Sequence, residues 1–166
     1  MIKRILTAIA ASIAVAAPVH ATPTNYTSLD LLELVQRNGI AVTVNENCPV
    51  NVLGNYQWVG MKRVINLCPG EEVDPIDHAT VRHEVWHAIQ HCVNTARGTS
   101  GETPVQDDLA ELNSYVTEIL SPSTIAYVKS NYKSSQWALE LEANLAETIF
   151  TPLQLAEVFI DTCTAE

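Results

Sequence analysis

The sequence predicts an α+β fold in which a small sheet comes first and a run of helices follows it within one domain. Two observations support this prediction. Segments rich in β-branched and aromatic residues, which favour strands, lie in the first third of the chain. From about residue 74 onward, apolar residues instead recur at the three- and four-residue spacing that is typical of amphipathic helices.

The first 21 of the 166 residues are typical of a secretory signal peptide. Lys3 and Arg4 form a basic start, an apolar run follows, and Val19-His20-Ala21 offers small residues for cleavage. The apolar run is shorter than the roughly 20 residues that a transmembrane helix needs. We therefore expect a signal peptide at 1–21, one domain at 22–166, and a mature protein that is secreted or periplasmic. An uncleaved N-terminal anchor is the alternative.

The expected elements of the N-terminal part are one helix and three strands. Ser28 is the expected N-cap of the helix, which spans residues 29–36 and ends at Asn38-Gly39. The strands are expected at Ile40–Val44, Tyr56–Val59 and Arg63–Leu67. We expect these strands to form a small antiparallel sheet.

Five helices are expected after the sheet. Asp77 is the expected N-cap of the first, which spans about residues 77–94. A flexible segment from Arg97 to Gly101 separates it from the second helix, which begins at Pro104 and ends near residue 120. The other helices are expected from about 123 to 132, from Ser134 or Ser135 to about 150, and from 152 to about 162.

The expected mature chain is strongly acidic. Without Lys3 and Arg4 it retains 7 of the 9 Lys and Arg residues and all 19 Asp and Glu residues, so its formal net charge is −12. Proteins that bind nucleic acid or anionic membranes need a basic face, so this charge argues against both classes of partner. We also expect no stable membrane insertion after cleavage of the signal peptide, and a monomer.

The chain contains an even number of cysteines and no Cys-x-x-Cys pair. In an exported protein this favours two disulfides over metal ligation. Four cysteines allow three pairings. Locality along the chain favours Cys48–Cys68 and Cys92–Cys163, of which the second would tie the C-terminus to the central helix.

The central helix carries His83-Glu84-Val85-Trp86-His87, which has the pattern H-E-x-x-H. Residues four apart lie on one face of a helix, so both imidazoles can reach one metal ion, and neutral imidazole suits zinc. Glu84 projects toward the same place, where a carboxylate can take a proton from a metal-activated water and pass it to a leaving amine. The motif therefore predicts a zinc site with Glu84 as the catalytic residue. A chance motif on a polar helix face is the alternative.

The third ligand must come from another part of the chain. His91 lies about 12 Å from His83 along a straight helix, which is too far for shared coordination. A carboxylate is therefore expected, and the helix that ends near residue 150 carries Glu140, Asn144 and Glu147 near one line. Glu140 is the best candidate, because a hydrogen-bonding amide follows it one turn later. A solvated acidic helix face is the alternative.

Together, His83-Glu84-x-x-His87 and the later Glu140-x-x-Ala143-Asn144 resemble the gluzincin branch of the zincin metallopeptidases. In that branch the third zinc ligand is the Glu of an E-x-x-A-D/N pattern. A wider frame, from Gly54-x-Tyr56 to Glu142-Ala143, is similar to small secreted metallopeptidases of bacteria and phages that carry an HExxH motif. This frame runs from residue 54 to about 147 and covers most of the expected mature chain.

The resemblance implies a zincin-like fold with three zinc ligands, namely His83, His87 and Glu140. It implies that Glu84 is the general base and that Asn144, where family members often have Asp, steadies a ligand. Glu142 is the competing third ligand. The resemblance also implies a strand that pairs with the substrate backbone beside the cleft, and Arg63–Leu67 is expected to be this strand.

The expected function is that of a secreted zinc metallopeptidase, a hydrolase that acts on a peptide or protein substrate by metal-activated water. Tyr127 and Tyr132 are candidate oxyanion donors, with core packing as the alternative role. The alternative function is a zincin-like module that binds zinc or a partner and cleaves nothing. The small size of the mature chain supports this alternative, because it leaves little chain for a second wall of the cleft.

Overall fold

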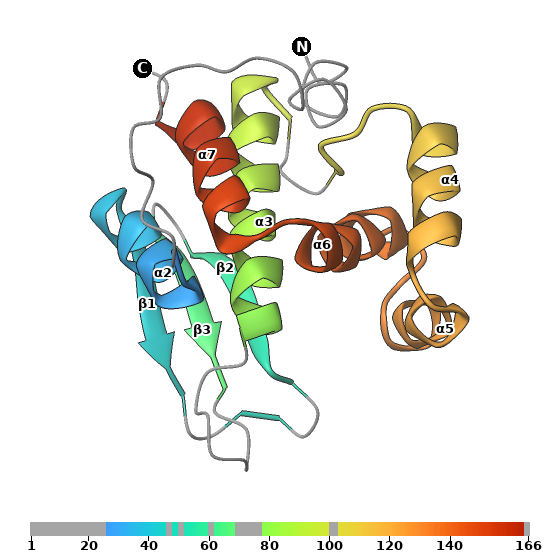
Figure 1. Ribbon diagram of the computed structural model, residues 1–166, viewed down its shortest axis with the longest axis horizontal. Coiled ribbons are helices and arrows are strands. Elements are labelled where there is room, and N and C mark those ends of the chain that lie inside the picture. The colour runs from blue at the N-terminus through green and yellow to red at the C-terminus, as the bar shows by residue number, and fades with distance from the viewer. Residues whose placement is uncertain are drawn as a thin grey trace.

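The computed structural model describes residues 26–45, 48–49, 52–59, 62–68, 78–99 and 103–164. In these ranges the chain forms six helices and one three-stranded sheet, so the predicted α+β class is confirmed (Figure 1). The predicted signal peptide at 1–21 and the predicted N-cap Asp77 lie outside the described residues.

The sheet is mixed, with the strand order β1-β3-β2, so the prediction of an antiparallel sheet is wrong. β2 (Gly54–Val59) runs antiparallel to β3 (Lys62–Leu67), whereas β1 (Ile40–Val44) runs parallel to β3 on its other side. The Cys48–Cys68 disulfide joins the segments that follow β1 and β3. It therefore holds the C-terminal ends of these two strands together, which requires that they run in the same direction.

α2 (Ser28–Arg37) packs against β1, α3 and α7. Its N-cap is Thr27 and not Ser28 as predicted, because Thr27 forms a reciprocal capping box with Asp30. Ser28 is already inside the helix and is buried. Gly39, with a φ of +80°, follows the end of the helix and leads the chain into β1.

α3 (His78–Ala96) is the central helix, and it contacts α2, α6 and α7 as well as β2 and β3 (Figure 1). Val81, Val85 and Ile89 lie along one stripe of α3 and are completely buried, as their spacing predicts. The helix extends two residues beyond the predicted end at residue 94. Because α3 packs on both the sheet and the other helices, it holds its side chains in fixed positions.

α4 (Leu109–Ile119) begins five residues later than the predicted start at Pro104. The Asp108 side chain caps the helix by accepting hydrogen bonds from the backbone N–H groups of residues 110 and 111. Upstream of this cap, the backbone N–H groups of Val105 and Gln106 donate to a carboxylate of α6. Residues 103–108 are therefore held in a non-helical conformation by a tertiary contact.

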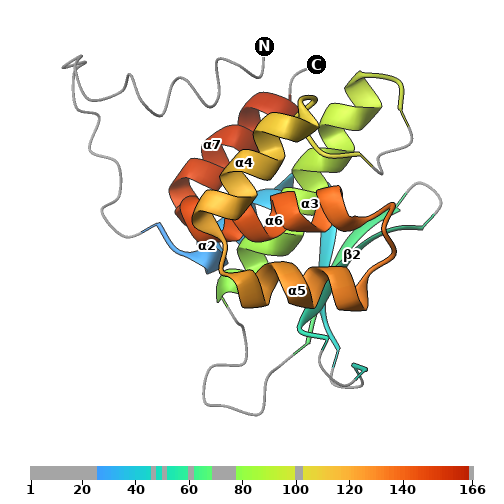
Figure 2. The same ribbon diagram turned by 90° about the vertical axis from the view of Figure 1, so that its right-hand side faces the viewer.

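The last three helices lie close to their predicted positions. α5 (Pro122–Asn131) is capped by Ser121, and α7 (Pro152–Cys163) is capped by Thr151. α6 (Trp137–Ile149) begins slightly later than predicted and has no side-chain cap. α4 and α5 both pack on α6 (Figure 2).

Two apolar clusters form the core. One surrounds α3 with side chains of β3, α2 and α7, and the other lies among α4, α5 and α6. Ile149 packs against both clusters, and the Cys92–Cys163 disulfide ties α3 to α7. Both predicted disulfides are therefore confirmed. Among the helices of the described ranges, none is both long and apolar enough to cross a membrane.

Gly54 lies where β2 meets α3. A Cβ atom at this position would lie 2.7 Å from Cγ2 of Thr80, 3.1 Å from Cγ of Glu84 and 3.2 Å from the carbonyl oxygen of Asn66. These separations are shorter than ordinary van der Waals contacts. The absence of a side chain at Gly54 therefore lets β2 lie against this part of α3.

We expect Gly54→Ala to lower the free energy of unfolding by about 1–3 kcal/mol, because the added methyl group must displace β2 or α3. Thr80→Ser removes the nearest contacting atom and keeps the hydroxyl group. The double variant should therefore lose less stability than the sum of the two single losses. Urea denaturation of the four proteins measures this coupling, and strictly additive losses would contradict the close approach.

Candidate metal centre

α3 and α6 pack on each other (Figure 1), and two histidines of α3 and one glutamate of α6 come together at their contact. His83 and His87 lie one turn apart, and their Nε2 atoms are 3.1 Å from each other. Oε2 of Glu140 lies 3.5 Å from Nε2 of His83 and 3.6 Å from Nε2 of His87. The structure therefore brings the three predicted ligands into one group that could hold a metal ion.

The other ring nitrogen of each histidine is held by a hydrogen bond. Nδ1 of His83 lies 3.0 Å from Oε2 of Glu147, and Nδ1 of His87 lies 2.7 Å from Oε1 of Gln90. Because both partner atoms are acceptors, each Nδ1 carries a hydrogen and donates it. In a neutral ring this tautomer leaves a lone pair on Nε2, which is the form that binds a metal ion.

The neighbouring carboxylates favour a positive charge between the two rings. Burial alone would lower the pKa of His83, but Glu140 and Glu147 raise it to about 10. Burial alone would raise the pKa of Glu140, but the two histidines lower it to about 2. The side chains of α3 and α6 therefore stabilise a cation here, whether a proton or a metal ion.

Three observations fit a metal ion. Oε2 of Glu140 is buried and has no hydrogen-bond partner among the described residues. Two imidazole nitrogens and one carboxylate oxygen form a donor set that zinc takes in catalytic sites. Ligand atoms about 2.1 Å from a tetrahedral ion lie about 3.4 Å apart, and the three separations here are 3.1, 3.5 and 3.6 Å.

Glu84 is a buried carboxylate beside this group, with a relative exposure of 4%. Within the described part of the chain, its Oε2 atom has no hydrogen-bond partner. Burial raises the pKa of Glu84, although the two histidines act in the opposite direction. A carboxylate with a raised pKa and an open acceptor position is suited to accept a proton.

The group lies at a cleft with a volume of about 450 Å³, which His83 and Glu84 line. Its walls come from residues 52–54 at the start of β2, from the first half of α3, from the end of α5 and from α6. Four segments of the chain therefore build the cleft, and α5 supplies a wall that the short chain was expected to lack.

Tyr127 and Tyr132, the two candidate oxyanion donors, both line this cleft. Burial raises the pKa of Tyr132, and the charge of the neighbouring Glu140 raises it further. The hydroxyl group of Tyr132 therefore stays protonated and can donate a hydrogen bond into the cleft. Tyr127 is half exposed.

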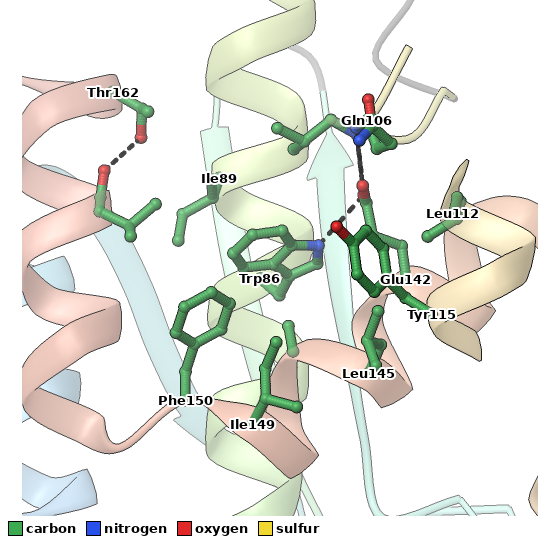
Figure 3. Close-up of a pocket in the computed structure, with 13 residues that line it drawn as sticks. Trp86, Ile89, Gln106, Leu112, Tyr115, Glu142, Leu145, Ile149, Phe150 and Thr162 are labelled. Carbon is green, nitrogen blue, oxygen red and sulfur yellow. Dashed lines mark hydrogen bonds between the residues drawn. The ribbon is translucent and has the colours of Figure 1, made fainter. Parts of the chain in front are cut away.

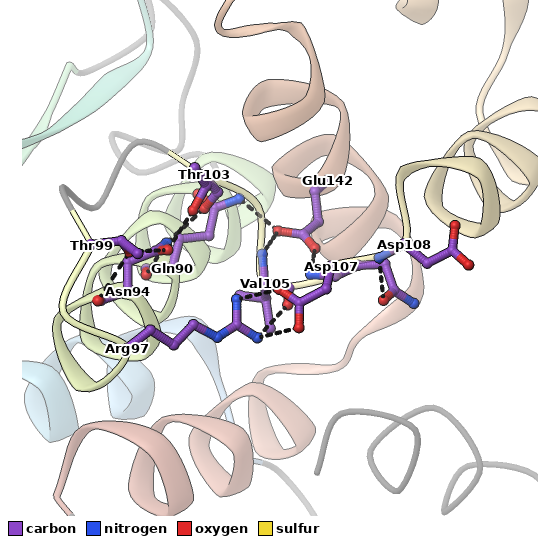
Figure 4. Close-up of polar contacts among 10 residues, drawn as sticks. Gln90, Asn94, Arg97, Thr99, Thr103, Val105, Asp107, Asp108 and Glu142 are labelled. Atoms are coloured by element: carbon purple, nitrogen blue, oxygen red, sulfur yellow. Dashed lines mark hydrogen bonds and ion pairs between the residues drawn. The ribbon is translucent and has the colours of Figure 1, made fainter.

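Glu142, the competing ligand, is not part of the group. Its carboxylate accepts hydrogen bonds from Nε1 of Trp86 and Nε2 of Gln90, both on α3, at 3.2 and 2.8 Å. It also accepts hydrogen bonds from the backbone N–H groups of Val105 and Gln106, at 2.8 and 2.7 Å (Figure 4). Of the two glutamates that the sequence left open, only Glu140 therefore approaches the histidines.

Asn144 forms no hydrogen bond with a histidine among the described residues. Its amide donates a hydrogen bond to the backbone carbonyl of Glu140, and Glu147 contacts His83 instead. A seven-residue spacing from Glu140 places Glu147 on the same face of α6 two turns later, and this spacing is the signal that could have identified it. The contact of Gln90 with His87 was not predicted either. The three-residue spacing, which puts both side chains on one face of α3, could have indicated it.

β3 is not a strand that a substrate can join, contrary to expectation, because β1 and β2 occupy both of its edges. The outer edge of β2 pairs with no strand in the described ranges. Leu53 and Gly54 at the start of β2 also line the cleft. β2 is therefore the strand that lies beside the site with an edge left for pairing.

A second, smaller cavity of about 50 Å³ is enclosed by α3, α4, α6 and α7 (Figure 3). Its lining is almost entirely apolar, so it does not resemble a metal site. Trp86 lines this cavity and stacks on Phe150, with ring centroids 5.5 Å apart. Trp86 is therefore a core residue.

No protein-family model matches this chain, and no curated protein or solved structure matches it. The interpretation of the site therefore depends on the geometry of its own residues. The resemblance to the gluzincins stays a sequence-based prediction.

We expect Glu140→Ala to weaken zinc binding by more than the roughly 10- to 100-fold that loss of an outer hydrogen-bond partner costs. His91→Ala is the matched control on α3, because His91 packs on Trp58 with ring centroids 4.4 Å apart and lies outside the group. Competition titration with a coloured chelator measures both affinities. Equal zinc affinity of Glu140→Ala and the unmodified protein would remove Glu140 from the ligand set.

Proposed function

We propose that this chain is an exported zinc metallopeptidase. The observation that carries the proposal is the buried Oε2 atom of Glu84, which has no hydrogen-bond partner among the described residues and lies beside the group of three ligand residues. A buried carboxylate normally has its oxygens paired, so an open position at this place favours a role in chemistry.

The choice of zinc and of catalysis follows from the number and type of ligands. Structural zinc ions take four protein ligands, whereas catalytic zinc ions take three and leave a position for water or substrate. The group in the described ranges has three members, and it lies at an open cleft. Zinc bound there would polarise a substrate carbonyl and lower the pKa of a water molecule to about 7.

The residues of the chain perform the remaining steps. Glu84 accepts the proton of the attacking water and then passes it to the leaving amine. One side chain therefore both takes and returns this proton, and Glu84 ends the reaction in the form in which it began. Glu147 and Gln90 hold the rings of His83 and His87 in the orientation that ligation needs. Tyr132 donates a hydrogen bond to the oxyanion that forms in the cleft.

A peptide is the substrate that the surroundings of the site favour. An extended peptide can add to the outer edge of β2, where backbone N–H and C=O groups face away from β3. Backbone pairing of this kind recognises main chain and tolerates many side-chain sequences. The start of β2 lines the cleft, so a peptide paired there would pass the metal group.

Export is supported by the two disulfides, which form and persist in oxidising compartments. The signal peptide expected at 1–21 would direct the chain there. The proposed protein is therefore secreted or periplasmic and takes up zinc outside the cytosol.

We expect Glu84→Gln to retain zinc and to lose at least about 100-fold in peptide cleavage, because the amide cannot accept the proton of the attacking water. Glu157→Gln on the exposed face of α7 is the matched control and should retain full activity. Zinc content and cleavage of a peptide library, followed by mass spectrometry with and without a chelator, measure both properties.

Two outcomes would contradict the proposal. If the purified mature protein does not bind zinc, the proposed metal is wrong. If Glu84→Gln cleaves peptides as fast as the unmodified protein, Glu84 is not the general base. Zinc binding without any cleavage would instead favour a zinc-binding module that is not an enzyme.

A further inference from the structure

Glu142 is a buried carboxylate that the proposed reaction does not use. It is 4% exposed, and its two oxygens accept four hydrogen bonds from α3 and from residues 105–106 (Figures 3 and 4). All four partners are N–H donors, so both oxygens of Glu142 act as hydrogen-bond acceptors. A buried hydrogen-bond acceptor therefore lies inside the molecule, two residues after Glu140 on α6.

The Glu142 carboxylate determines the orientation of the Gln90 amide. Nε2 of Gln90 donates one hydrogen bond to Glu142, at 2.8 Å, and one to the backbone carbonyl of Leu139, at 3.0 Å. Both amide hydrogens are thereby used on acceptors of α6. The flipped amide would place its oxygen against these two acceptors, so Oε1 of Gln90 must face the other way.

Oε1 of Gln90 faces Nδ1 of His87, at 2.7 Å. An acceptor at this position requires a hydrogen on Nδ1 and leaves the lone pair on Nε2, the atom that faces His83 and Glu140. A donor at the same position would favour the other tautomer, in which Nε2 carries the hydrogen and cannot bind a metal ion. The chain of contacts from Glu142 through Gln90 thus selects the ligating form of His87.

We propose that Glu142 is a positioning residue for the metal centre, which acts through Gln90 to hold His87 in the tautomer and orientation that bind zinc. The inference rests on the proposed zinc site and assigns a role to two residues outside the ligand set. It also explains why Glu142 is buried among donors of α3 and of residues 105–106.

Zinc affinity and the tautomer of His87 test this proposal. Glu142→Gln and Gln90→Met should each weaken zinc binding by about 10- to 100-fold, as the loss of an outer partner of a ligating histidine does. The double variant should bind no more weakly than the weaker single variant, because both changes break the same chain of contacts. Nitrogen-15 NMR of the zinc-free proteins should show a hydrogen on Nδ1 of His87 in the unmodified protein and a loss of this preference in both variants.

Trp86→Phe is the matched control. It removes another donor to Glu142 from the same helix but leaves Gln90 in contact with His87, and Phe can keep the stacking on Phe150. This variant should melt at a lower temperature and yet bind zinc as tightly as the unmodified protein. If Trp86→Phe loses as much zinc affinity as Glu142→Gln, the effect is general destabilisation and the proposal is wrong.

Unchanged zinc affinity and an unchanged His87 tautomer in Glu142→Gln would overturn the proposal. If Glu142→Gln does not fold, Gln90→Met decides alone, because it leaves three donors on Glu142. The results expected if the proposed peptidase function is wrong differ from those expected if this inference is wrong. Protein that binds zinc without cleaving peptides leaves this inference intact, and protein that binds no zinc leaves the NMR measurement of His87 to decide it.

Discussion

The packing of α6 against α3 buries two carboxylates of α6, those of Glu140 and Glu142, and the chemistry of the interior depends on the partners that each carboxylate finds there. Burial of a charge costs several kcal/mol unless partners replace the lost water. Glu142 receives four hydrogen bonds, which satisfy it completely. Oε2 of Glu140 faces the Nε2 atoms of His83 and His87, which offer lone pairs when the rings are neutral. The buried oxygen of Glu140 therefore has a favourable partner only when a cation lies among these three atoms. At the contact of α3 and α6, the hydrogen-bonding capacity of Glu142 is therefore filled, whereas Glu140 keeps an oxygen free for a cation.

The rest of the structure serves to hold this contact in place. α4 and α5 pack on the outer side of α6, and the sheet approaches the first half of α3 at Gly54. Glu147 and Gln90 contribute from the same two helices and orient the rings. Local unfolding of either helix would expose several buried polar groups together, so the site and the core share their stability.

Local patterns in the sequence were sufficient to predict much of this fold. The apolar stripe of α3, the three strands and the positions of the last three helices depend on residues close together in the chain, and all are found in the structure. The four-residue spacing of the histidines also predicted that they share a face. The pairing of the cysteines was predicted from their order along the chain, and both bridges are found in the structure.

Features that depend on distant contacts could not be predicted. β-propensity does not encode the direction of β1 relative to β3, and the mixed sheet became clear only from the register of the strands. The start of α4 depends on Glu142, which lies 37 residues after Val105. Glu140 and Glu142 are two residues apart and so lie on nearly opposite sides of α6, and only tertiary packing decides which side meets the histidines.

The Cys92–Cys163 bridge has a consequence for the lifetime of the proposed enzyme. A peptidase outside the cell is exposed to its own activity, and cleavage of a helix requires that it first unwind into an extended form. The bridge attaches the last turn of α7 to α3, five residues beyond His87. The C-terminal helix therefore cannot fray away from the helix that carries the candidate metal centre, and in the proposed peptidase this would close one route to self-digestion.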